Sequence, residues 1–140
     1  MNQTGKKLEL SPENAIVFAG YGLLFSYYTE HDKFIPLPGV KELVSKLAER
    51  NVKIGCLSNT GHNSSTEFAS RLEESGIIIP KENVVTAADA ALAHIKTRWG
   101  SNLRKLRVLF LGRKKGGLYE LLQQENVTFV NDPNERAELA

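Results

Sequence analysis

Short apolar runs alternate with helical patterns along the whole chain, and this alternation restricts the fold more than any other feature of the sequence. Strands that alternate with helices are typical of a parallel sheet with helices on its faces. We therefore expect an α/β three-layer sandwich, with a Rossmann-like core and a five-stranded parallel sheet flanked by helices. The five apolar runs are residues 15–19 (AIVFA), 52–57 (VKIGCL), 84–86 (VVT), 108–111 (VLFL) and 128–130 (TFV).

The segments between these runs have the residue spacing of amphipathic helices. Four helices are predicted, over residues 40–48, 65–75, 86–99 and 118–125. The third opens with a T-x-x-D pattern at Thr86 and Asp89, which is typical of a helix start, and is the longest. A further short helix is expected to open at residues 132–135, where Asp, Pro, Asn and Glu follow one another.

The chain has the length of one domain. Its 140 residues, with 41% hydrophobic and 24% charged side chains, exclude a disordered chain and predict a single unit over 1–140. Residues 1–14 are interpreted as an N-terminal extension. Residues 23–37 are too long for a tight turn and carry four aromatic residues, so we expect a hairpin or flap over the first loop.

Charge and cysteine content exclude several classes of protein. A formal charge of +2 does not by itself announce a nucleic-acid or membrane binder. The single cysteine, Cys56, excludes an intrachain disulfide framework, and three histidines leave no spacing typical of a zinc site. No apolar run is long enough for a signal peptide or a membrane span. We therefore expect a cytoplasmic protein that does not associate with membranes.

Three short motifs follow the predicted strands in a characteristic order. The first motif, residues 19–24 (AGYGLL), begins at the last residue of the first predicted strand. The second, Leu57-Ser58-Asn59, begins at the last residue of the second strand. The third, residues 108–113 (VLFLGR), consists of the fourth strand and the two residues after it. From Ala15 to about Asp132 the chain resembles the haloacid dehalogenase superfamily of phosphohydrolases. In that family the first motif reads D-x-D-G-[TV]-[LV]. Residues 58–91 look particularly like the subgroup that includes sugar-phosphate and nitrophenyl-phosphate hydrolases.

The sequence departs from this family at the residues that perform the chemistry. The resemblance implies that Ala19 stands where the nucleophilic Asp would be, and a methyl group cannot attack phosphorus. Tyr21 replaces the acid/base Asp, and a phenol is poorly matched to that task near neutral pH. Arg113 replaces the fourth-motif Asp that helps to hold Mg²⁺, so we expect that metal to be lost. Lys96 lies on the helix that would carry the family's third-motif lysine, without a secure match, and no cap domain is expected.

These departures predict a catalytically inactive pseudoenzyme that acts as a binding, scaffolding or regulatory protein. A phosphorylated small molecule or another anion is the expected ligand, and protein partners are also expected. The run GRKKGG combines glycines, cations and a helix start, which suits an anion site, although a solvated basic turn is the alternative. Ser58 and Asn59 would cradle a phosphoryl group or simply turn the chain. The expected anion-binding residues are therefore Ser58, Asn59, Arg113, Lys114 and Lys115.

Three other functions stay open at this point. A hydrolase with atypical residues would use Asp32, Asp89 or Asp132 as a substitute acid. A structural subunit would have its former pocket filled by Tyr21 and the flap. A nucleic-acid-associated protein would use the basic residues between 96 and 107 together with those at 113–115.

Overall fold

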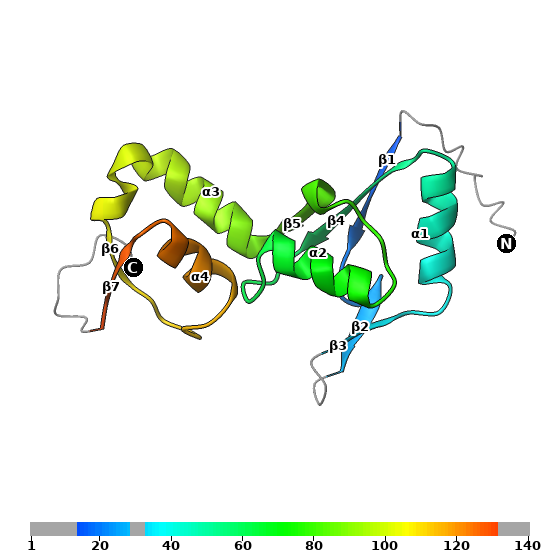
Figure 1. The fold of residues 1–140 in the computed structure, drawn as a ribbon, viewed down its shortest axis with the longest axis horizontal. Helices are drawn as coiled ribbons and strands as arrows, with labels where there is room; N and C mark the ends of the chain where they lie inside the picture. Colours follow the sequence, from blue (N-terminus) through cyan, green and yellow to red (C-terminus); the bar gives the residue numbers. More distant parts are fainter. Residues whose placement is uncertain (1–13, 29–32, 132–140) are drawn as a thin grey trace, which may run out of the picture.

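The computed structural model describes residues 14–28 and 33–131, which form two groups of elements joined by a long helix (Figure 1). The described strands are β1 (Ala15–Ala19), β2 (Phe25–Tyr28), β3 (Lys33–Pro36), β4 (Lys53–Ser58), β5 (Val84–Thr86), β6 (Arg107–Leu109) and β7 (Thr128–Val130). The helices are α1 (Val40–Glu49), α2 (Ser65–Glu74), α3 (Ala87–Trp99) and α4 (Gly117–Gln124), with short 3-10 turns η1 (Lys81–Asn83) and η2 (Gly100–Lys105).

The first group is built on a parallel sheet in the order β1-β4-β5. Its register places Phe18 beside Cys56 and Cys56 beside Val84, and all three side chains are buried. Helices α1 and α2 pack on this face with the apolar sides that the sequence predicts, including Val44 and Leu72. The carboxyl ends of β1 and β4 therefore lie side by side, as a site at this edge requires.

The second group has its own sheet and its own core. Strands β6 and β7 pair in parallel, with Val108 opposite Phe129. Helices α3 and α4 pack together and against these strands. The buried residues of this cluster are Ile95, Leu103, Leu106, Val108, Leu122 and Val127, none of which belongs to the cluster of the first group.

The α/β class, the five parallel strands and the four helices are confirmed, but the expected continuous sheet is wrong. The five strands divide into a three-stranded sheet and a two-stranded sheet, and the latter consists of β6 and β7. The reason lies in α3, which begins directly after β5 and buries Ile95 against the second group. The number of elements is consistent with a core that lacks a cap, and the single-domain organisation stays a prediction.

Within residues 14–28 and 33–131, helices cover one face of the first sheet and not the other. Burial alternates along β1, with Phe18 buried and Val17 65% exposed. Leu57 and Val85 share the exposed side with Val17, since the register aligns all three on one face. The apolar sequence of β1 suggested burial on both faces, but the described residues cover only one.

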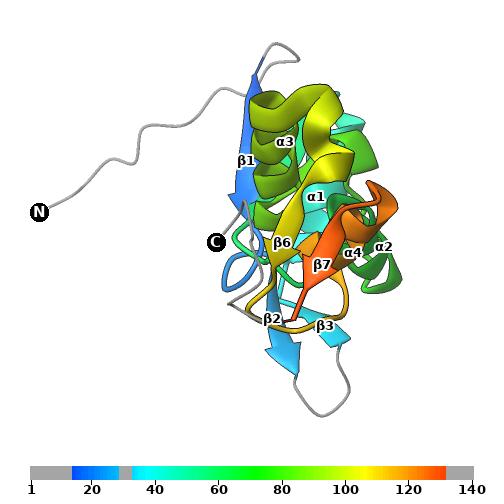
Figure 2. The same cartoon turned by 90° about the vertical axis from the view of Figure 1, so that its left-hand side faces the viewer.

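Two predicted helix starts and the predicted hairpin are confirmed, and its role as a flap over the first loop stays a prediction. Ser64 caps α2 through a capping box with Glu67, and the Thr86 hydroxyl accepts a hydrogen bond from the Asp89 N–H at the start of α3. Strands β2 and β3 form the predicted antiparallel hairpin, which projects beyond the end of the first sheet (Figure 2). The predicted extension at 1–14, apart from Asn14, and the short helix at 132–135 lie outside the described residues.

Candidate functional site

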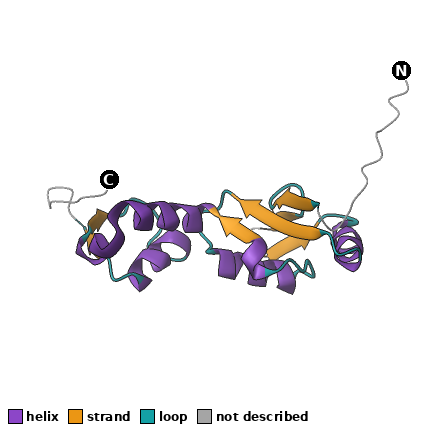
Figure 3. Ribbon diagram, turned by 90° about the horizontal axis from the view of Figure 1, so that it is seen from above, coloured by secondary structure: helices purple, strands orange, loops and turns teal. Residues whose placement is uncertain are grey.

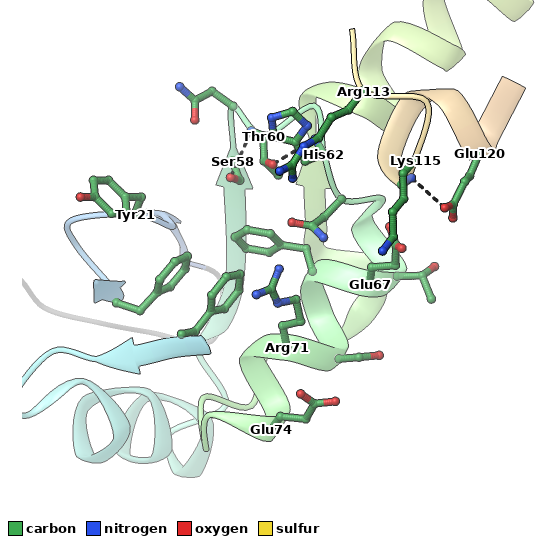
Figure 4. A pocket seen from close by; sticks show the side chains of 18 residues that line it. Tyr21, Ser58, Thr60, His62, Glu67, Arg71, Glu74, Arg113, Lys115 and Glu120 are labelled. Atoms are coloured by element: carbon green, nitrogen blue, oxygen red, sulfur yellow. Dashed lines mark hydrogen bonds between the residues drawn. The ribbon is translucent and has the colours of Figure 1, made fainter. Parts of the chain in front are cut away.

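A cavity of about 1020 Å³ opens where β4 ends, between the hairpin, α2 and the loop that precedes α4 (Figure 4). Its lining comes from both groups of elements: Tyr21, Phe34 and Ser58 belong to the first, and Arg113 and Lys115 to the second. The site that the sequence places at the carboxyl ends of the strands is therefore an open cavity of the size of a small-molecule pocket.

Four of the five predicted anion-binding residues line this cavity. They are Ser58, Asn59, Arg113 and Lys115, and the last two form no hydrogen bond or ion pair with another described residue. Lys114 does not line it, because its Nζ donates to Asn131 Oδ1 at 2.6 Å. The structure thus brings together two of the three predicted cations.

Ser58 ends β4 and has both of the roles considered for it at the sequence level. Its side chain is 9% exposed and its Oγ accepts a weak hydrogen bond from the Thr60 N–H at 3.4 Å, so it does help to turn the chain. The same residue lines the cavity, with Asn59 exposed beside it. The two readings are compatible, since a turn hydroxyl remains available to a ligand.

The start of α4 reaches the cavity through a close backbone contact. A Cβ built on Gly117, whose φ is +49°, would lie 2.1 Å from the Gly61 carbonyl oxygen. The Leu118 N–H donates to that same oxygen at 3.3 Å. Only glycine fits here, and this contact holds the 112–117 loop against the loop that follows β4.

An internal carboxylate already occupies the start of α4. The Gly116 N–H donates to Glu120 Oε1 at 2.7 Å. Glu67 is used in the same way at the start of α2, where its Oε2 accepts from the Ser64 N–H at 2.7 Å. Two of the acidic residues that line the cavity therefore act as helix caps.

A second cavity of about 520 Å³ adjoins the first at the ends of β1 and β5, and the two positions matched to the aspartates of the family's first motif lie here. Ala19 and Tyr21 line it. Its other lining residues are Gly20, Leu57, Ser58, Asn59, Thr86, Ala87 and Ala90, so no described carboxylate faces it. Tyr21 is 69% exposed and meets Phe25 only edge-on, with ring centroids 6.5 Å apart. Tyr21 therefore does not fill this cavity, and the side chains of Tyr27 and Tyr28 on the flap lie outside the described part of the structure.

Arg113, the residue matched to the fourth motif, follows β6, which lies in the two-stranded sheet and not in the sheet of β1. It reaches the cavity from the second group, across from Ser58. The expectation of one five-stranded sheet is wrong here, whereas the match of Arg113 to the fourth motif stays a prediction.

Of the three substitute acids considered for an atypical hydrolase, the structure describes one, Asp89. Asp89 Oδ2 accepts from the Ser65 N–H at 2.6 Å, and its Oδ1 accepts from the Ser65 hydroxyl at 3.0 Å. The Thr86 hydroxyl also donates to Asp89, which thus joins the starts of α2 and α3 and does not line either cavity. Asp32 and Asp132 lie outside the described residues.

The sequence analysis did not identify Arg71 or the aromatic floor of the first cavity. The rings of Phe25 and Phe34 stack at 3.9 Å, Phe68 packs against both, and the Arg71 guanidinium lies 4.5 Å above the Phe34 ring. These rings are buried, so they form the floor of the cavity. The aromatic residues of the flap were a signal for this floor, but Arg71 on α2 had none.

His62 and Glu74 also line the first cavity, whereas Lys96 and Cys56 line neither cavity. Lys96 Nζ and Glu125 Oε1 form an ion pair at 2.5 Å in the second group. Lys96 does not line the first cavity, where a third-motif lysine would be expected. Burial raises the pKa of the Cys56 thiol to about 11, so it is a packed side chain and a weak nucleophile. Within residues 14–28 and 33–131, no group of three or more His, Cys, Asp or Glu side chains is placed to hold a metal ion. No helix among the described residues is long and apolar enough to cross a membrane.

A family model of haloacid dehalogenase-like hydrolases matches residues 20–128 of the chain, which is well over half of its length. No curated protein sequence matches the chain significantly. The match starts one residue after Ala19 and ends inside β7, so it includes both groups of elements.

Three solved structures share the fold, and two of them are phosphatases. A putative NagD protein superposes with a TM-score of 0.68 at 18% identity, over 94% of this chain and 47% of that one. 4-Nitrophenylphosphatase from Thermotoga maritima superposes with a TM-score of 0.62 at 21% identity, over 90% of this chain and 42% of that one. Glycerol phosphate phosphatase from Mycobacterium tuberculosis, solved with magnesium, superposes with a TM-score of 0.61 at 22% identity, over 89% of this chain and 34% of that one. The chain spans less than half the length of each.

Proposed function

The chain belongs to the haloacid dehalogenase-like hydrolases, and from this premise we propose that it binds a phosphorylated or other anionic ligand without hydrolysing it. In this proposal the chain is a pseudoenzyme, and ligand binding regulates its association with protein partners. The observation that carries the proposal is the lining of the second cavity, in which the former catalytic positions Ala19 and Tyr21 have no described carboxylate beside them.

The loss of catalysis follows from the groups that are present at these positions. Attack on phosphorus needs a lone pair, which the Ala19 methyl group lacks. Asp89 cannot replace it, because its two oxygens accept hydrogen bonds at the starts of α2 and α3. Removal of a nucleophile from a catalytic unit commonly reduces the rate by several orders of magnitude.

The same substitutions do not fit a magnesium ion. Mg²⁺ prefers oxygen ligands, above all carboxylates, in octahedral geometry. The positions in question offer a methyl group at Ala19 and a phenol at Tyr21, and the guanidinium of Arg113 faces the adjoining cavity. No described carboxylate lines the second cavity, and Glu67 and Glu120, which line the adjoining one, accept hydrogen bonds at helix starts. We therefore propose that ligand binding is independent of Mg²⁺.

Anion binding is supported by what remains in the first cavity. Arg113 and Lys115, which pair with no other described residue, bring positive charge to its wall, opposite the Ser58 hydroxyl. Guanidinium, ammonium and hydroxyl groups are the donors that phosphate oxygens accept from. The solved structures with this fold include phosphatases for glycerol phosphate and 4-nitrophenyl phosphate. A small phosphomonoester is therefore the ligand class proposed for this chain.

Thermal unfolding tests this proposal. A ligand at about 100 times its Kd stabilises a protein by about 2.7 kcal/mol, which raises the Tm of a domain of this size by several degrees. We expect glycerol phosphate or inorganic phosphate to produce this rise equally with Mg²⁺ and with EDTA. Arg113→Glu should abolish it, while the matched variant Arg104→Glu, whose side chain lies in η2 and lines neither cavity, should retain it. A rise that requires Mg²⁺, or no rise with any anion, would contradict the proposal.

A further inference from the structure

The first cavity is larger and longer than a small phosphomonoester requires. Its volume of about 1020 Å³ lies at the upper end of the range for pockets that hold drug-sized ligands. The exposed side chains of Thr66, Ser70 and Glu74 line it at intervals of four residues, so the cavity follows one face of α2 for two turns. At about 1.5 Å per residue, Thr66 and Glu74 lie about 12 Å apart along the helix. A phosphate group on a three-carbon chain therefore fills only part of the cavity.

The two ends of the cavity carry opposite charge. Helix α2 begins beside the second group of elements and runs away from it (Figure 1 and Figure 3). A Cβ built on Gly116 would lie 2.6 Å from the His62 carbonyl oxygen, just before α2, so the loop that carries Arg113 and Lys115 lies at the start of this helix. Glu74 is the last residue of α2 and lines the cavity at the opposite end (Figure 4). A ligand that fills the cavity meets two cations at one end and a carboxylate at the other.

The carboxylate of Glu74 is available to a ligand. It is exposed and forms no hydrogen bond or ion pair with another described residue. The other two carboxylates that line the cavity, those of Glu67 and Glu120, accept N–H groups at helix starts. The Lys41 ammonium packs beside Gly76, just past α2, and does not line the cavity. The negative end of the α2 dipole adds to the attraction that a positive group feels beside Glu74.

The surface between the two ends suits a polypeptide backbone. The side chains of Thr66 and Ser70 are exposed, so the cavity is open to solvent along α2 and a bound chain can continue beyond both ends. Their hydroxyl groups can donate to peptide carbonyl oxygens and accept from peptide N–H groups. The Arg71 guanidinium, held 4.5 Å above the Phe34 ring, is a further donor to a carbonyl oxygen. This middle part of the cavity offers hydrogen bonds without a demand for a particular side chain.

We propose that the phosphomonoester bound in this cavity is a phosphoserine of a partner protein, and that the same segment of the partner places a Lys or Arg against Glu74. The inference rests on the proposed function, because it needs the phosphate to bind at Arg113 and Lys115. Side chains four positions apart in an extended segment lie on the same side, about 13 Å from each other. This separation matches the length of α2 between the two charged ends. Arginine and lysine side chains commonly recognise phosphorylated segments in this manner.

Fluorescence anisotropy of labelled peptides with blocked ends, mixed with the full wild-type chain, tests the inference. The salt concentration is about 0.15 M, so that charges more than about 8 Å apart are screened. In one of its two orders, the peptide pSer-Gly-Gly-Gly-Lys should bind at least about threefold more tightly than the same peptide with Glu in place of Lys, because an exposed ion pair replaces a like-charge contact. It should also bind more tightly than glycerol phosphate. The peptide without its phosphate should not bind.

Glu74→Lys should reverse the preference, so that the Glu peptide binds more tightly than the Lys peptide. Glu73→Lys is the matched control, because Glu73 is the preceding residue of α2, is also exposed and lines neither cavity. It should keep the preference of the wild type.

Equal binding of the Lys and Glu peptides by the wild type, the same reversal in both variants, or binding of the peptide without its phosphate would overturn the inference. Binding of glycerol phosphate together with equal binding of the two phosphopeptides would overturn this inference alone. No binding of any phosphorylated compound would overturn the proposed function as well.

Discussion

The Gly116 N–H donates to Glu120 Oε1 at 2.7 Å, so the start of α4 holds a carboxylate where an anionic ligand would otherwise bind. The bond gives an acceptor to the Gly116 N–H, which has none within the helix, and places the negative charge of Glu120 at the edge of the first cavity. A phosphate that approaches Arg113 and Lys115 must therefore tolerate or displace Glu120.

Glu120→Gln should strengthen anion binding. The amide oxygen of Gln still accepts from the Gly116 N–H, but the negative charge is gone, so phosphate should bind several-fold more tightly by titration calorimetry. Glu82→Gln, in η1 and away from both cavities, should leave the Kd unchanged. Equal affinity of Glu120→Gln and wild type would show that anions do not approach the start of α4.

Gly117→Ala should destabilise the protein. The added Cβ lies 2.1 Å from the Gly61 oxygen at a backbone φ of +49°. We expect a loss of more than about 2 kcal/mol in urea unfolding, because the left-handed backbone alone costs about 1 to 2 kcal/mol in a residue with a side chain. Gly39→Ala isolates that backbone cost, since Gly39 has a φ of +79° and open space around it. Equal losses in the two variants would contradict the proposed contact.

Asp89→Ala should also reduce stability, because Asp89 joins two helix starts. Its loss leaves the Ser65 N–H and the Thr86 hydroxyl without their acceptor, at a cost of about 2 to 3 kcal/mol. Asp89→Asn should lose less, since one oxygen remains. Chemical unfolding measures both. Full stability of Asp89→Ala would reopen a role for this carboxylate in a reaction.

The buried thiol of Cys56 predicts a loss of stability in alkali. Burial raises its pKa to about 11 in the folded protein, above the ordinary value near 9, so the unfolded state loses its proton first. The buried thiol therefore contributes at most about 3 kcal/mol to the free energy of unfolding. This contribution is fully present below pH 9 and is lost as the pH rises through 11. The pH dependence of the Tm should be shallower in Cys56→Ala above pH 9. The same pH dependence of the Tm in Cys56→Ala and wild type would contradict this prediction.

The sequence predicts the elements better than it predicts how they assemble. Local signals such as the Thr86 cap and the apolar run of β1 identify strands and helices within one or two residues, because those signals act within a few residues of the chain. The position of β6 depends on a long-range choice between pairing with β1 or with β7, which periodicity does not encode. The sequence therefore predicted one five-stranded sheet where the described residues form two parallel sheets.

The candidate site shows the same division. Ser58 and Arg113 were found because a strand end and a glycine-rich basic loop are local patterns. Arg71 was missed, since its place above Phe34 depends on how α2 packs against the hairpin. The Lys114 contact with Asn131 likewise joins segments that only the fold brings together.

Phosphorus NMR of glycerol phosphate mixed with the protein in the presence of Mg²⁺ tests the central claim most directly, because one spectrum reports both binding and hydrolysis. The account predicts that the phosphomonoester signal broadens or shifts in a saturable manner, that EDTA leaves this unchanged, and that no inorganic phosphate signal grows. A growing inorganic phosphate signal that requires Mg²⁺ would identify a working hydrolase, and an unaltered phosphomonoester signal would show that the cavity binds no phosphorylated ligand of this kind; either result would contradict the account.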